Sequence, residues 1–85
     1  MKWTVGPEFD EALFRRLGSA LRTSGFSVSD EWWGVAGTTE ISHWDLGSPD
    51  GELAVEAETY MGLTVEGPDE LVWRVREQFE HDEST

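Results

Sequence analysis

The 85-residue sequence predicts an α+β fold: an antiparallel sheet of four strands, or five if the first segment also pairs, with two helices packed on one face. Apolar residues recur at helical spacing near both ends of the chain. Between these ends the apolar period falls from about 3.6 residues to about 2, which is typical of strands. A tight-turn signature inside that region predicts an antiparallel hairpin. The expected order is (β)-α-β-β-β-β-α.

The first 25 residues predict a short strand over 2–5 and a helix over 7–24. Gly6 and Pro7 end the strand, and proline is well tolerated in the first turn of a helix. The three acids that follow suit the positive end of the helix dipole, and Gly25 is a C-terminal stop signal. The apolar stripe that we expect this helix to bury consists of Phe9, Leu13, Leu17, Ala20 and Leu21.

The central region predicts the remaining strands. Alternation from Phe26 onward places Trp32 in the core and Trp33 on the opposite side of the sheet. The segment "SPDG" at 48–51 has proline second and glycine fourth, which is a signature of a type I turn. We expect strands over 26–33, 38–46, 52–60 and 63–66.

The C-terminal region predicts a second helix that starts at Pro68. Asp69 and Glu70 then lie at the positive end of the helix dipole. The apolar stripe consists of Leu71, Val72, Val75 and Phe79. We expect a single α+β domain over 1–80, followed by a flexible acidic tail over 81–85.

Acidic residues dominate the middle of the chain. The formal net charge is −12, although residues 1–25 carry four bases against three acids. Residues 26–67 contain no Lys or Arg, whereas natural surfaces usually mix charges of both signs. The nine acids of this segment are Asp30, Glu31, Glu40, Asp45, Asp50, Glu52, Glu56, Glu58 and Glu66.

The register of the 38–60 hairpin decides which of these acids share a face. If Ser48 faces Glu52 across the turn, Trp44 faces Glu56, and the side of the sheet without helices combines aromatics and carboxylates with no cation of its own. A shift of one residue would instead send Trp44 to the core and His43 outward. The partner-binding residues that we expect on this side are Glu31, Trp33, Glu40, Trp44, Glu56, Glu58 and Tyr60.

The same acids are also compatible with two hypotheses that need no partner. Charged residues are ordinary on the solvent side of a half-buried sheet. A proteome-wide bias, such as salt adaptation, would also enrich acids, but it should spread evenly along the chain, whereas residues 1–25 carry a net charge of +1.

The sequence shows no catalytic, cofactor or metal motif, and we expect a protein that is not an enzyme. His43 with Asp45 resembles a fragment of a metal or acid–base site, but a half-buried histidine bonded to a neighbour is commoner. Glu56 and Glu58 would lie on an open sheet rather than in a cleft that could raise one pKa, as a glycosidase pair requires. The absence of cysteine excludes disulfides and thiolate chemistry.

Several partner classes are also disfavoured. Direct nucleic-acid binding needs a basic patch, and this chain offers the opposite charge. No stretch approaches the ~20 apolar residues of a membrane span, and the N-terminus lacks the apolar run of a signal peptide. We therefore expect a cytoplasmic protein without a membrane partner.

These properties favour a small, non-catalytic binding protein whose acidic, aromatic-bearing face docks on a basic protein surface. An inhibitor, an immunity protein or an anti-defence protein that mimics nucleic acid and blocks a basic nucleic-acid-handling partner fits the size and charge. One alternative is a structural domain that forms a homodimer through a sheet edge or face. The other is an acid-rich housekeeping domain with no specific charged partner.

Overall fold

The computed structural model describes residues 1–83, and its elements follow the order β-α-β-β-β-β-α. This confirms the predicted fold class, with the first segment forming the fifth strand. The strands are β1 (Lys2–Gly6), β2 (Ser27–Ala36), β3 (Thr39–Ser48), β4 (Gly51–Glu58) and β5 (Gly62–Glu66), and the helices are α1 (Glu11–Thr23) and α2 (Asp69–Glu83).

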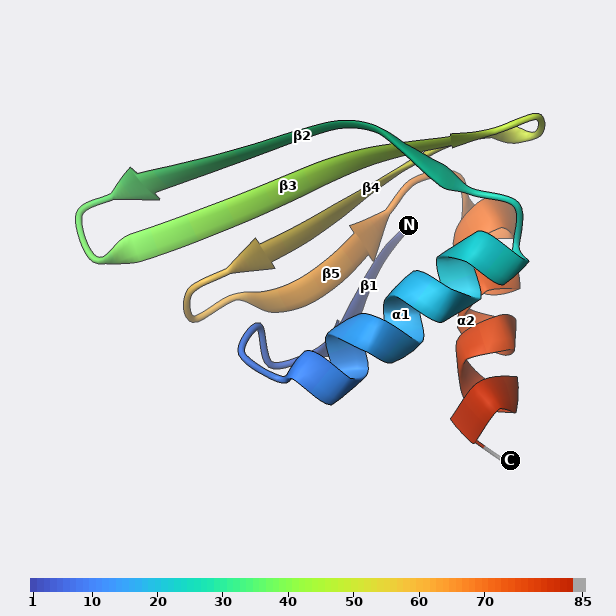
Figure 1. The fold of residues 1–85 in the computed structure, drawn as a ribbon, viewed down its shortest axis with the longest axis horizontal. Coiled ribbons are helices and arrows are strands. Elements are labelled where there is room, and N and C mark those ends of the chain that lie inside the picture. Colours follow the sequence, from blue (N-terminus) through green and yellow to red (C-terminus); the bar gives the residue numbers. More distant parts are fainter. Residues whose placement is uncertain (84–85) are drawn as a thin grey trace.

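The strands form one antiparallel sheet in the order β1-β5-β4-β3-β2. The four strands from β2 to β5 pair in chain order, and β2 forms one edge of the sheet. Strand β1 pairs with β5 and forms the other edge. Figure 1 shows both helices on the same side of the sheet, as predicted. We call that side the helix-side face, and we call the side without helices the open face.

Helix α1 begins later than the sequence predicts. Asp10 is its N-cap, and the Asp10 carboxylate accepts a hydrogen bond from the backbone N–H of Leu13 at 3.1 Å. Phe9 lies in the turn before this cap and is exposed, so its predicted place on the buried stripe is wrong. The middle of the stripe is confirmed, because Leu17 and Leu21 are buried.

The core lies between the two helices and the middle of the sheet. Burying an aliphatic side chain of this kind contributes about 1.5–3 kcal/mol. The most completely buried large side chains come from α1, β5 and α2, and they are Leu17, Leu63, Val65, Val72 and Val75. The predicted stripe of α2 is buried along its whole length, which confirms that face of the helix.

The C-terminal helix is longer than expected. Helix α2 continues to Glu83 and so includes the first three residues of the predicted tail over 81–85. Residues 84–85 lie outside the described residues, and the flexibility of the tail stays a prediction.

The hairpin of β2 and β3 projects beyond the helical layer, as Figure 1 shows on the left. Strand β2 is an edge strand, and every residue in it except Gly34 is exposed. The sheet is therefore only partly covered even on its helix-side face.

Candidate functional site

The hairpin that joins β3 to β4 has a register one residue away from the expected one. Ser48 pairs directly with Gly51, so the loop between them holds two residues rather than three. Trp44 consequently pairs with Val55 instead of Glu56. Because neighbouring residues of a strand point to opposite sides, Trp44 lies on the helix-side face and Glu56 on the open face. The predicted pairing of Trp44 with Glu56 is wrong.

Burial of Leu46 explains the observed register. Leu46 pairs with Leu53 on the helix-side face, where Leu46 is only 4% exposed. The expected register would have placed Leu46 on the open face and His43 in the core, exchanging a buried apolar side chain for an ionisable one. The turn contributes locally, because the Ser48 hydroxyl donates a hydrogen bond to the Gly51 carbonyl at 3.2 Å.

A β-bulge in β2 exchanges the faces expected for two tryptophans. The pairing with β3 shifts between Val28 and Asp30, so Ser29 is the extra residue and the alternation resumes one residue out of step. Trp32, expected in the core, lies on the open face and is 49% exposed. Trp33, expected on the open face, lies on the helix-side face and is 64% exposed. Both predicted orientations are wrong.

The seven predicted partner-binding residues do not share one face. Glu56 and Glu58 lie on the open face, as expected. Tyr60 lies in the turn after β4, where it has a positive φ of 70° and is exposed. The other four lie on the helix-side face, and they are Glu31, Trp33, Glu40 and Trp44. The expectation of one surface made by all seven is wrong, while their contact with a partner stays a prediction.

The open face nevertheless gathers six of the nine acids of residues 26–67. Successive residues on one face of a strand lie roughly 6.6 Å apart, so these carboxylates share one continuous surface. The six residues, which we call the acidic face, are Asp30, Asp45, Glu52, Glu56, Glu58 and Glu66. Lys2 pairs with Glu66 at the β1 edge. The expectation that this side has no cation of its own is therefore wrong at that edge.

His43 lies at the centre of the open face and joins two of these acids. Its Nδ1 hydrogen-bonds Glu56 Oε2 across the strands at 2.9 Å, and its Nε2 hydrogen-bonds Asp45 Oδ1 on its own strand at 2.8 Å. Ionised carboxylates only accept hydrogen bonds, so both contacts are satisfied together when both ring nitrogens carry a proton. This geometry favours the imidazolium form.

The environment of His43 affects its pKa in two opposing ways. Burial alone would lower the pKa, because it penalises the charged ring. The hydrogen bonds and the negative charges of Asp45 and Glu56 outweigh burial and raise the pKa above its usual range. The ring is enclosed further by Trp32, whose indole stacks on it, and the His43 side chain is only 16% exposed. From the sequence we expected His43 to be a half-buried, hydrogen-bonded histidine rather than part of an acid–base centre.

The aromatic residues of the helix-side face form a separate group. The indole N–H of Trp44 donates a hydrogen bond to Glu31 Oε2 at 3.0 Å. The ring of Trp44 packs on Phe14 of α1, with ring centroids 5.2 Å apart. Trp33 and Ser42 line a shallow hollow together with Trp44 and Glu31. Trp44 is therefore partly enclosed by its own domain and lies away from the acidic face.

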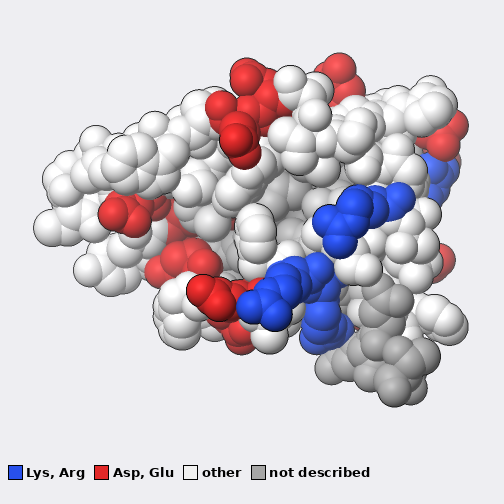
Figure 2. Space-filling view, in the orientation of Figure 1, with Lys and Arg blue, Asp and Glu red and all other residues white. Residues whose placement is uncertain are grey.

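The arginines lie on the other side of the molecule from the acidic face. All five arginines belong to the helices, three to α1 and two to α2. Figure 2 shows basic side chains over the helical layer with acidic side chains beside them, and further acidic side chains along the upper rim, where the sheet lies. Arg74 also neutralises Asp50 at the β3–β4 turn through an ion pair of 2.8 Å. The helical layer thus mixes charges of both signs, since α2 alone carries six acids, whereas strands β1 to β5 contain a single Lys or Arg, Lys2.

The open face also holds residues that the sequence did not place there, among them Asp30, Trp32, His43 and Asp45. One available signal was the apolar pair Leu46 and Leu53, which the expected register separates. The bulge at Ser29 has no comparable signal in the sequence.

Among residues 1–83, no group of three or more His, Asp or Glu side chains is arranged to hold a metal ion. Within the same range neither helix has the length and apolar character needed to cross a membrane. The chain matches no protein-family model, and neither curated proteins nor solved structures give a match. The fold and the open face together define a small α+β protein with an acidic, uncovered sheet surface.

Proposed function

We propose that this protein is a small, non-catalytic binding module whose acidic face docks on a basic surface of another protein. One observation carries the proposal. The uncovered side of the sheet holds six carboxylates and, on the edge strand β2, the half-exposed ring of Trp32, while every arginine lies in the helical layer. Such a surface is complementary to a cationic partner and repels an anionic one.

Charge and hydrophobicity have separate roles in this proposal. Carboxylates on neighbouring residues repel one another weakly in water, and a basic partner would replace this repulsion by attraction across the contact. Trp32 supplies the large, rigid apolar surface that is typical of residues dominating the binding energy of interfaces. His43 beneath it fixes the orientation of the indole ring.

The partner class that fits best is a protein that handles nucleic acid, because its basic groove is built to bind polyanions. The protein would then act as an inhibitor, an immunity protein or an anti-defence protein. Its mimicry of nucleic acid would be approximate, since duplex DNA carries one charge per ~1.7 Å and same-face residues of a strand are roughly 6.6 Å apart.

A homodimer through the sheet edge is the second candidate, and the exposure of β2 favours it. Nine of its ten residues are exposed at an edge that no other strand covers in the described part of the chain. Antiparallel pairing of two β2 strands would extend the sheet across the dimer. Pairing through the open faces is disfavoured, because it would bring two acidic faces together.

Charge reversal on the open face tests the main proposal. The test variant combines Glu52→Lys, Glu58→Lys and Glu66→Lys and leaves the His43 contacts intact. The control, Glu77→Lys with Glu80→Lys, reverses two charges on α2 and gives up the ion pair of Glu80 with Arg76. Affinity capture from the source cell identifies the partner, and the dissociation constants are then measured with the purified partner and with duplex DNA as competitor.

The proposal predicts that the control binds like the unmodified protein, that the open-face variant loses binding while keeping its circular dichroism spectrum, and that DNA competes. Equal binding by the folded open-face variant would overturn it. A mass in solution twice that of the monomer, insensitive to salt and to these charge reversals, would favour the homodimer instead.

A further inference from the structure

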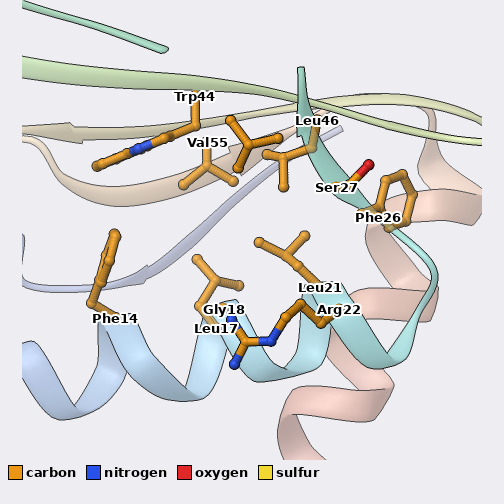
Figure 3. Close-up of a pocket in the computed structure, with 11 residues that line it drawn as sticks. Phe14, Leu17, Gly18, Leu21, Arg22, Phe26, Ser27, Trp44, Leu46 and Val55 are labelled. Carbon is orange, nitrogen blue, oxygen red and sulfur yellow. The ribbon is translucent and has the colours of Figure 1, made fainter. Parts of the chain in front are cut away.

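An apolar groove separates α1 from the strands above it. Its volume is about 350 Å³, which lies within the ~300–1,000 Å³ typical of small-molecule sites. Figure 3 shows Phe14, Leu17 and Leu21 of α1 pointing toward Trp44, Leu46 and Val55 of the sheet, with the groove between the two rows. Phe14 and Val28 also line the groove and are largely exposed. The groove is therefore open to solvent.

Gly18, in the middle of α1, also lines the groove. Glycine is the least favourable residue after proline inside a helix, so its presence there calls for a reason. Packing does not supply one. A Cβ atom at Gly18 would have only Arg22 Nη1 as a neighbour within 4 Å, at an ordinary contact distance of 3.6 Å. The effect of the glycine is to leave the middle of the groove unfilled.

Arg22 lines the same groove, one helical turn after Gly18. No hydrogen bond or ion pair of its guanidinium is found among the described residues. The other four arginines each have a partner, Glu11 for Arg15, the Phe79 carbonyl for Arg16, Asp50 for Arg74 and Glu80 for Arg76.

We propose that this groove binds a small amphiphile with an apolar chain and a carboxylate head group. The chain lies between α1 and β3, along the surface that Gly18 leaves open. The carboxylate pairs with the guanidinium of Arg22, a group suited to bind carboxylates through two parallel hydrogen bonds. The groove is on the helix-side face, so the proposal is independent of any partner on the acidic face.

Ligands that differ only in their head group test the assignment. Decanoate and decyltrimethylammonium are titrated below their micelle concentrations and decan-1-ol below its solubility limit, and NMR follows the backbone N–H of Gly18 and the indole N–H of Trp44. The proposal predicts saturable shifts at both groups. Decanoate should bind about two- to fivefold more tightly than decan-1-ol, the gain expected of one exposed ion pair, and the ammonium compound most weakly. No saturable shift, or equal affinity for all three ligands, would overturn it.

Substitutions at the two residues separate the roles of chain and head group. Gly18→Leu fills the groove and should abolish binding of decanoate and decan-1-ol, whereas Ala12→Leu, on the exposed side of α1, should leave both unchanged. Gly18→Ala is the second variant, for use if Gly18→Leu does not fold. It narrows the groove less and should weaken the binding of both decanoate and decan-1-ol. Because alanine favours the helix, it should also raise Tm. Arg22→Gln should weaken decanoate alone. Unchanged decanoate binding in a folded Gly18→Leu or Gly18→Ala protein would contradict the proposal.

Discussion

The indole of Trp32 stacks on the imidazole of His43, with ring centroids 5.2 Å apart and ring planes within 11° of parallel. A tryptophan face attracts a cationic ring, and both nitrogens of His43 are hydrogen-bonded to carboxylates. An aromatic ring, a histidine and two acids therefore form one contiguous group on the open face, which runs from the edge strand β2 to the middle strand β4. This group orders the surface that we propose for partner binding.

The first prediction concerns the dependence of stability on pH. The pKa of His43 is raised in the folded protein, so its contribution to stability is fully present below the unfolded pKa of about 6.5 and is lost as pH rises through the folded value. Urea unfolding should show a decrease in the free energy of unfolding as pH rises through this window. The variant His43→Gln should show a smaller decrease. Equal pH dependence in both proteins would contradict the assigned hydrogen bonds.

The second prediction tests the hairpin register. Leu46→Ala should lower the free energy of unfolding by about 2–5 kcal/mol, the usual loss for a buried leucine. Ile41→Ala should cost clearly less, because Ile41 is on the open face and only half-buried. Chemical denaturation of the two variants makes the comparison. A larger loss at Ile41 than at Leu46 would support the alternative register.

The third prediction concerns the turn between β4 and β5. Gly62 has a φ of +90°, and a Cβ atom there would lie 2.6 Å from the carbonyl oxygen of Gly6. Gly62→Ala should therefore cost at least about 1 kcal/mol, measured by thermal or urea unfolding. Gly47→Ala is the matched control, because a Cβ atom at Gly47 meets nothing within 4 Å. Equal stability of the two variants would argue against the strained turn.

Most of the fold could be predicted from local patterns. Helical spacing of apolar residues located both helices, and alternation together with the "SPDG" turn located the strands. The start of α1 could not be placed from the proline alone, because the Asp10 side chain rather than Pro7 caps the helix.

The orientation of side chains was less predictable, since it depends on single residues. A two-residue and a three-residue loop are both compatible with the segment from Ser48 to Gly51, and the choice between them reverses the faces of one strand relative to the other. Strand β4 keeps its expected faces, and those of β3 are exchanged. The bulge at Ser29 does the same for β2. The concentration of acids on the open face was expected and is observed, but of the seven predicted residues only Glu56 and Glu58 lie there.

The most direct test of the binding proposal is the salt dependence of the dissociation constant for the purified basic partner. Raising the ionic strength from about 0.1 M to about 1 M shortens the Debye length from ~10 Å to ~3 Å. If the acidic face makes the contact, the dissociation constant should rise steeply over this range for the unmodified protein and for the Glu77→Lys, Glu80→Lys control. A dissociation constant that stays constant with salt would contradict electrostatic docking of the open face.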